Sequence, residues 1–242
     1  MNKASINLIK QLKKQKRENP NLLFLDNPKI ISDAVQAGHK VILGLVDDEN
    51  KRIVGLSDDK QFLADKNTIN MLSDVKTPQG VCVMIEYTQN IVMEPKSNFL
   101  VLDGLQDPGN VGTLIRTALA SGFNDVYLIE SVNETNLKMI RSSAGANFNI
   151  NLYSVNREEF ISLAKKWKLN LIKTDMQGEN IFKFKPKSKV GIVIGNEGKG
   201  VSEDISKLCA TSVSIPMKKG IESLNAGVSG AIIMYQINKD NF

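Results

Sequence analysis

The second half of the chain repeats one pattern, in which a short, continuously apolar segment precedes a segment whose apolar residues have helical spacing. Apolar segments of this kind stand at 99–105 (FLVLDGL), 125–130 (DVYLIE) and 189–195 (KVGIVIG). Strands that are apolar at every position are buried on both faces, and intervening helices supply the crossovers that parallel strands require. We therefore predict an α/β fold with a parallel sheet covered on both faces. Further strands are predicted at 150–155, 169–175 and 212–216, and helices at 111–122, 135–146, 157–168, 201–209 and 224–237.

The first 88 residues predict a second, smaller α/β unit. Its strands are expected at 21–26, 41–47 and 81–88, with a helix that Pro28 opens and Gly38 ends. A turn is expected at 77–80 (TPQG) before the last strand. The segment 89–97 contains a proline and no clear periodicity, which predicts a linker. We expect three parts: a basic N-terminal helix or arm over 1–17, a domain over 18–92 and a domain over 98–242.

The net charge of +5 is unevenly distributed along the 242 residues. Residues 1–17 carry six basic and no acidic side chains, whereas residues 18–95 carry seven basic and twelve acidic ones. A basic helix is either a contact for a polyanion such as RNA or a solvated helix face. The acidic excess that follows, with few aromatic side chains, does not favour base stacking in that domain.

Several classes of site are excluded by what the sequence contains. The two cysteines, Cys82 and Cys209, stand alone among apolar residues and predict core positions, and the only histidine is His39. This composition argues against a zinc site and against a Ser-His-Asp triad, so we expect no metal. No apolar run reaches the ~18 residues of a membrane span. With no secretory signal pattern, we expect a cytoplasmic protein that does not insert into a membrane.

Three loops follow predicted strands and are rich in glycine, asparagine and charge: 103–112, 195–200 and 216–225. In open parallel sheets, ligands bind beyond the carboxyl ends of the strands, so these loops predict a cofactor site. The loop at 195–200 (GNEGKG) matches neither the GxGxxG nor the GxxxxGK[ST] pattern. A nucleotide-cofactor oxidoreductase therefore lacks its motif.

Each loop also has an ordinary structural interpretation. Pro108-Gly109 predicts a turn, and Asn110 is expected to cap a helix beginning near Val111. Arg116 would then lie near the start of that helix, where it is either a surface cation or a contact for an anion such as RNA phosphate. In the last loop, Ser223 predicts the N-cap of the closing helix.

Taken together, the three loops resemble the signature motifs of the SpoU (TrmH) family of RNA ribose 2′-O-methyltransferases, within the SPOUT superfamily. The resemblance covers about residues 98–238, and residues 1–88 resemble the ribosomal-protein-like substrate-binding domain that many members carry. The matching residues are Asp107-Pro108-Gly109-Asn110-Val111-Gly112 with Arg116, then Ile194-Gly195-Asn196-Glu197-Gly198-Lys199-Gly200, then Ile215-Pro216-Met217 with Glu222-Ser223-Leu224-Asn225.

The resemblance implies a C-terminal α/β domain whose chain end forms a deep trefoil knot. It also implies a homodimer that uses S-adenosyl-L-methionine as its cofactor and RNA as its substrate. Ribosomal RNA is the first expectation and transfer RNA the alternative. By similarity, the catalytic group comprises Arg116, Asn110, Glu197, Ser223 and Asn225, and the cofactor-binding group comprises Gly195, Asn196, Gly198, Ile215, Met217 and Leu224.

The role of Arg116 stays open between two alternatives. The family analogy makes it the residue that assists removal of the hydroxyl proton, but a guanidinium is almost always protonated. It could equally hold the neighbouring phosphate as a cation. The chain also has Lys219 where many members have glycine, with Gly220 following. A protein that binds RNA without catalysis is the remaining alternative, although the complete polar set argues against it.

Overall fold

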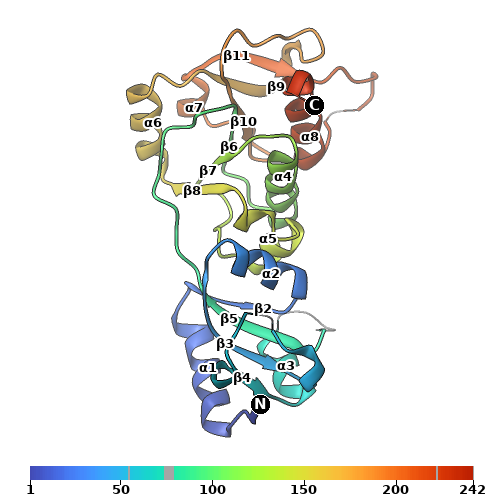
Figure 1. Ribbon diagram of the computed structural model, residues 1–242. Helices are drawn as coiled ribbons and strands as arrows, with labels where there is room; N and C mark the ends of the chain where they lie inside the picture. The colour runs from blue at the N-terminus through green and yellow to red at the C-terminus, as the bar shows by residue number, and fades with distance from the viewer. Residues whose placement is uncertain (54, 74–78, 222, 242) are drawn as a thin grey trace. The chain divides into compact units, whose positions relative to one another are not determined.

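The computed structural model describes residues 1–53, 55–73, 79–221 and 223–241. Its contacts divide the chain into two units, residues 1–88 and residues 89–242 (Figure 1). Among the described residues, no helix combines the length and the apolar character that crossing a bilayer requires.

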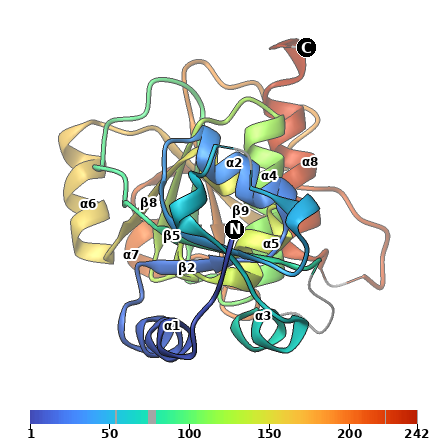
Figure 2. The ribbon, with the colours of Figure 1, turned by 60° about the horizontal axis from the view of Figure 1, so that its bottom comes forward.

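The first unit is a five-stranded mixed sheet with the strand order β1-β4-β3-β5-β2. Helices α1 and α3 lie on one side of this sheet and α2 on the other (Figure 2). The strands are β1 (Asn2–Lys3), β2 (Leu22–Leu25), β3 (Lys40–Val46), β4 (Gln61–Leu63) and β5 (Val81–Glu86). The helices are α1 (Ile6–Glu18), α2 (Pro28–Gln36) and α3 (Lys66–Leu72), with short 3₁₀ turns at Glu49–Lys51 and Asp58–Lys60.

The basic N-terminal helix is an integral part of this unit. Leu12 of α1 is 1% exposed and packs in one core with Phe24, Leu45 and Ile69. The basic helix predicted within 1–17 is present as α1, but it is not a separate part of the chain, because it is amphipathic and buries its apolar side in this unit. Cys82 belongs to the same core, which confirms its predicted core position.

Three elements of this unit were not predicted, the first being the two-residue strand β1. The stretch between β3 and β5 contains β4 and α3, of three and seven residues. Elements this short show too little periodicity to stand out, although Asp65 is a good N-cap that accepts the Thr68 amide at 2.7 Å. Of the predicted turn at 77–80, Thr77 and Pro78 lie outside the described residues.

The second unit contains a six-stranded sheet with the order β11-β9-β10-β6-β7-β8, in which every pairing is parallel. This confirms the predicted α/β fold with a parallel sheet. The strands are β6 (Phe99–Asp103), β7 (Asp125–Ile129), β8 (Asn151–Val155), β9 (Leu171–Asn180), β10 (Gly191–Gly195) and β11 (Cys209–Ser214). The helices are α4 (Pro108–Ala120), α5 (Leu137–Ser142), α6 (Arg157–Lys166), α7 (Glu203–Ser206) and α8 (Ala226–Ile237), with 3₁₀ turns at Ala146–Phe148 and Lys239–Asn241.

Helices cover both faces of this sheet (Figures 1 and 2). Helices α6 and α7 pack on one face through Phe160 and Ile205, against Val101 and Val193 of the central strands. Helix α4 lies between α5 and α8 on the other face. Glycine permits this close packing, because a Cβ at Gly112 would lie 2.6 Å from the Met139 carbonyl oxygen of α5.

The segment predicted as a linker, 89–97, has no regular secondary structure and packs on the second unit. The Tyr127 hydroxyl donates to the Met93 carbonyl, and Lys189 Nζ donates to the Pro95 carbonyl at 2.6 Å. Three other elements differ from expectation: β9 continues to Asn180, α7 has only four residues, and α5 has six residues where a helix over 135–146 was predicted. Cys209 is half-buried at the start of β11.

Candidate active site

The candidate site lies at the point in the sheet where the order of the strands changes direction. Strands β6 and β10 are neighbours, with Asp103 paired to Gly195, and the chain leaves them toward opposite edges of the sheet. Such a switch point leaves an opening beyond the carboxyl ends of the two strands. The loops that follow Asp103 and Gly195 therefore lie beside each other.

Helix α4 begins in the first of these loops and is capped by Asp107. The Asp107 Oδ1 atom accepts the backbone amides of Gly109 and Asn110, the latter at 3.1 Å. These two amide hydrogen bonds hold the pKa of the Asp107 carboxyl below its usual value, and the bond from Asn110 has the larger effect. Asn110 was predicted as the cap, which is wrong: Pro108 occupies the first helical turn, so the cap is the residue before it.

Asn110 instead joins the three loops through its side chain. Its Nδ2 donates to Glu197 Oε1 at 3.0 Å, and its Oδ1 accepts from Asn225 Nδ2 at 2.8 Å. We call these three side chains the Asn110 junction. The junction brings together one residue from each of the three motifs found in the sequence.

Asn225 has a second role as the N-cap of α8. Its Oδ1 accepts the Val228 amide at 3.2 Å while its Nδ2 contacts Asn110. The predicted cap, Ser223, is therefore wrong, and the helix begins two residues later than that prediction required. Because the capping hydrogen bond fixes the side-chain amide of Asn225, the start of α8 determines where Asn225 meets Asn110.

The loop after β10 is a tight turn in which Asn196 and Gly200 exchange two backbone hydrogen bonds, at 3.0 and 2.9 Å. The Asn196 side chain donates to the Gly104 carbonyl at 2.8 Å and accepts the amides of Gly198 and Lys199. A Cβ at Gly195 would lie 2.2 Å from the Gly200 carbonyl carbon, so only glycine fits there. These contacts hold Glu197 at the tip of the loop.

A cavity of about 710 Å³ opens beside the junction, between strand β9 and the segments that follow β10 and β11. Eight of the eleven predicted site residues line it, while Asn110, Arg116 and Gly198 do not. Glu222, which belongs to the third motif, lies outside the described residues. The eight lining residues are Gly195, Asn196, Glu197, Ile215, Met217, Ser223, Leu224 and Asn225.

One wall of the cavity was not predicted from the sequence. It is formed by the middle of β9, where Lys173, Thr174, Asp175 and Met176 line the space. Lys173 Nζ lies 3.3 Å from Asp175 Oδ2 and donates to the Ser206 hydroxyl at 2.9 Å. The pKa of the Asp175 carboxyl lies below its usual value, mainly because the Gln177 backbone amide donates a hydrogen bond to it. The Lys173 ammonium lowers this pKa further. The sequence signal was the position of Asp175 at the end of the strand predicted at 169–175.

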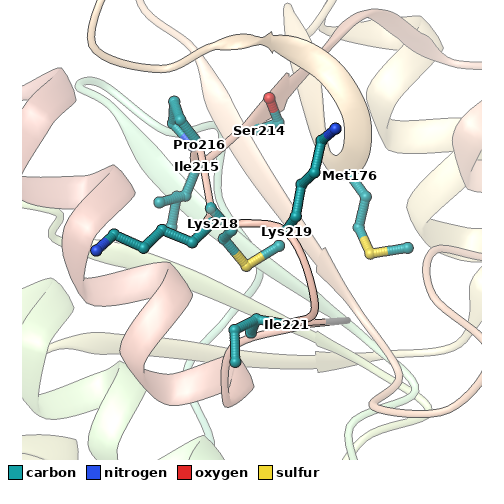
Figure 3. Close-up of a pocket in the computed structure, with 8 residues that line it drawn as sticks. Met176, Ser214, Ile215, Pro216, Lys218, Lys219 and Ile221 are labelled. Carbon is teal, nitrogen blue, oxygen red and sulfur yellow. The ribbon is translucent and has the colours of Figure 1, made fainter.

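A second recess, of about 540 Å³, adjoins the first and shares Met176, Ser214, Ile215 and Met217 with it. Figure 3 shows Met176 across this recess from Ile215 and Pro216, with the Lys218 and Lys219 side chains extending to different sides. Three large apolar side chains are exposed to solvent here: Met176 (68% exposed), Ile221 (58%) and Met217 (37%). The recess thus combines apolar surface with two cations.

Arg116 stands on the exposed side of α4, six residues after Asn110. At 1.5 Å per residue, its backbone is about 9 Å along the helix from that of Asn110. In the part of the chain that the structure describes, its guanidinium has no hydrogen bond or ion pair. It is therefore available to an external anion.

Two further observations limit the kinds of chemistry that the site can perform. The described residues contain no group of three or more His, Cys, Asp or Glu side chains suited to hold a metal ion. The polar groups at the cavity are amides, hydroxyls, carboxylates and ammonium groups. Such groups can align a hydroxyl and accept a proton, which is the chemistry of a group transfer assisted by a general base.

Comparison with known proteins gives matches over most of the chain. Residues 97–235 match the model of the SpoU rRNA Methylase family. The 23S rRNA (guanosine(2553)-2′-O)-methyltransferase RlmP of Bacillus subtilis (strain 168) is 26% identical over 227 residues, which cover 93% of this chain and 91% of that protein.

Solved structures show the same fold. The AdoMet-bound rRNA methyltransferase from Sinorhizobium meliloti superposes with a TM-score of 0.86 at 20% identity, covering 100% of this chain and 98% of that one. The SpoU methyltransferase AviRb from Streptomyces viridochromogenes, solved in complex with AdoMet, has a TM-score of 0.81 at 23% identity and covers 98% of both chains.

Proposed function

Because this chain belongs to the SpoU rRNA Methylase family, we propose that it transfers a methyl group from S-adenosyl-L-methionine to a ribose 2′-hydroxyl of RNA. Ribosomal RNA is the proposed substrate, since the family is named for it and the Bacillus subtilis relative is named for a 2′-O position of 23S rRNA. The observation that carries the proposal is the Asn110 junction, which unites the three motifs beside a cavity.

The cavity suits the proposed cofactor in size and chemistry. Its volume of about 710 Å³ falls within the range of about 300–1,000 Å³ that small-molecule sites occupy. Ile215 and Leu224 offer apolar surface for a purine, and Asp175 and Glu197 offer carboxylates for cationic groups. The tight turn at Gly195 exposes backbone to the ligand. When bound, the cofactor would supply an electrophilic methyl group on a sulfonium sulfur.

The residues of the junction would align the hydroxyl and receive its proton. A bond forms between the ribose 2′-oxygen and the methyl carbon as the carbon–sulfur bond breaks, and the hydroxyl proton passes to a base. Within the described residues, Glu197 has one hydrogen bond, from Asn110, so its other oxygen is open to that proton. Ser223 and Asn225 lie at the same cavity and would orient the ribose.

We assign Arg116 to the phosphate next to the reacting ribose. Its exposure and its lack of an ion pair among the described residues support this role, since a guanidinium can contact phosphate through two parallel hydrogen bonds. Lys218 and Lys219, at the adjoining recess, would bind further phosphates and so position the RNA.

Arg116→Lys tests this assignment. Lysine keeps the charge but loses the two-pronged contact, so we expect the RNA KM to rise about tenfold while kcat stays within about threefold. Methyl transfer from tritiated S-adenosyl-L-methionine to RNA gives both constants. Arg141→Lys, on the neighbouring helix α5, is the matched control and should leave both constants unchanged. A normal RNA KM with kcat reduced by orders of magnitude would instead place Arg116 in proton transfer.

The reaction itself is tested with the wild-type chain. Calorimetry should detect binding of S-adenosyl-L-methionine, and RNA carrying a 2′-deoxy nucleotide at the modified position should not accept a methyl group. A chain that binds the cofactor and RNA without transfer would be an RNA-binding protein that has kept the fold. Transfer to transfer RNA in preference to ribosomal RNA would change the substrate assignment only.

The remaining expectations are proposals of the same kind. We propose that the chain end forms a trefoil knot: β11 lies at the edge of the sheet, yet α8, which follows it, packs on α4 and on β10. We propose a homodimer that buries the open side of α8, where Val228 and Tyr235 are 49% and 46% exposed. We also propose that residues 18–92, with α1, form the RNA-binding domain.

A further inference from the structure

Asp103 is a buried carboxylate at the centre of the switch point. It ends β6, an otherwise apolar strand, and is 1% exposed. A charge withdrawn this far from water is costly unless hydrogen bonds and an opposite charge compensate for it. Asp103 does not line the cavity, so its burial points to a role other than ligand contact.

Both oxygens of Asp103 are engaged. Its Oδ2 accepts the backbone amide of Ser202 at 2.7 Å, and its Oδ1 accepts from Arg157 Nη2 at 3.1 Å. Arg157 also lies 2.9 Å from Glu130 Oε2, at the end of β7. The carboxylate thus links the segment after the 196–200 turn to a guanidinium that is itself fixed at a second point.

The 196–200 turn is therefore held at both ends by two consecutive residues. At its start, the Asn196 side chain donates to the Gly104 carbonyl at 2.8 Å. Just beyond its end, the Ser202 amide donates to Asp103. Between these two anchors the turn carries Glu197, whose only hydrogen bond within the described residues comes from Asn110. The position of Glu197 thus depends on both anchors.

We propose that Asp103 is a positioning residue for Glu197, which it holds at the Asn110 junction by anchoring the Ser202 amide. This inference rests on the proposed function, in which Glu197 receives the hydroxyl proton. Loss of the anchor would let the turn shift, and a displacement of about 1 Å at a reacting group can reduce the rate about a hundredfold.

Ser202 offers a matched pair of substitutions. Its φ of −60° suits proline, so Ser202→Pro removes the amide proton that Asp103 accepts while keeping the local backbone angle. Ser202→Ala keeps that proton and removes only a hydroxyl, which has no hydrogen-bond partner among the described residues. We expect Ser202→Pro to lower kcat at least about tenfold with the RNA KM within about threefold, and Ser202→Ala to match the wild type.

A double-mutant cycle separates positioning from general loss of structure. In a Glu197→Gln background, Ser202→Pro should lower kcat by less than about twofold, because the group it positions is already disabled. Asp103→Asn, which keeps the shape of the side chain, should show the same dependence on Glu197 and serves if the proline variant does not fold. Glu130→Gln leaves the Ser202 anchor intact and should keep wild-type kcat.

The inference is overturned if Ser202→Pro and Asp103→Asn both keep wild-type kcat, or if their effects multiply fully with that of Glu197→Gln. Absence of methyl transfer by the wild-type chain, with RNA and S-adenosyl-L-methionine both present, would instead contradict the proposed function. The two failures are therefore distinguishable by the wild-type measurement alone.

Discussion

A single amide group, that of Asn110, connects residues 87 and 115 positions away in the chain. An amide is well suited to this place, because it donates to the Glu197 carboxylate from one atom and accepts from Asn225 with the other. Neither a carboxylate nor an ammonium group can do both at neutral pH. The chemistry of the junction therefore depends on the side-chain amide of Asn110.

Cys209 provides a pH-dependent prediction at this scale. Burial, the largest cause, raises the pKa of its thiol to about 11; the Lys173 ammonium opposes this shift and the Asp103 carboxylate adds to it. At pH 8.5 we expect iodoacetamide to alkylate Cys209 about a hundredfold more slowly in the folded chain than in the denatured chain, as peptide mass spectrometry would show.

The same shift has a consequence for stability. Because the neutral thiol is favoured in the fold, its contribution is fully present below about pH 8.5 and is lost as the pH rises toward about 11. Cys209→Ser should remove that part of the alkaline loss of stability. An alkylation midpoint near pH 8.5 in the folded protein would contradict the prediction.

Helix caps show what sequence could and could not resolve about single residues. The segment Asp107-Pro108-Gly109-Asn110 contains two good N-cap residues, and Pro108 was the signal that favours Asp107. The sequence contains no comparable signal for the Asp103–Ser202 contact, since its partners are 99 positions apart and one is a backbone amide. Motif residues were thus predictable, whereas the groups that hold them were not.

At the scale of elements, α4 is the helix on which the site is built. It starts at the switch point, carries both Asn110 and Arg116, and packs between α5 and α8. This packing requires small residues, because a Cβ at Gly112 would lie 2.5 Å from Ser142 Cβ and 2.8 Å from the Ser143 amide nitrogen. Backbone and Cβ atoms cannot move aside as the end of a flexible side chain can.

Gly112→Ala should therefore lower the free energy of unfolding by about 1–3 kcal/mol. Helix propensity alone predicts the opposite sign, a gain of about 0.5–1 kcal/mol. Urea unfolding followed by circular dichroism measures the difference. Thr113→Ala, at the next and exposed position of the same helix, is the control and should be neutral or slightly stabilising. A stabilised Gly112→Ala would show that α4 and α5 separate readily.

Elements were predictable where apolar runs are long. Phe99–Asp103 and Gly191–Gly195 are buried at every position and stand out as strands. The second half of β9 does not, because Met176–Asn180 is polar and largely exposed and is held by pairing with β11 across two irregular registers. The cavity wall at Asp175 was missed for the same reason.

At the scale of the whole molecule, each unit has its own core and its own charge pattern. Leu12 anchors α1 in the first core, so deleting the basic segment would disrupt that unit rather than remove an appendage. Lys10, Lys14 and Arg17 are exposed on the same helix. Substitution of these side chains tests the helix without removing its buried side.

A triple variant should weaken RNA binding; it combines Lys10→Gln, Lys14→Gln and Arg17→Gln. The slope of log affinity against log salt concentration should fall in magnitude by up to about 2, because three phosphate contacts on single-stranded RNA would be lost. S-adenosyl-L-methionine binding should not change. The control removes three exposed lysines elsewhere, at positions 165, 166 and 187. Equal losses from both triple variants would show a general effect of charge and no role for α1 in RNA binding.

The Asn110 junction also determines when the site can form during synthesis of the chain. The three side chains belong to residues 110, 197 and 225, so they span most of the second unit. Until residue 225 has left the ribosome, the newly made chain can pair β6 with β10 but cannot complete its site. A chain that stops after β11 would therefore retain much of the sheet yet lack Asn225 and be inert.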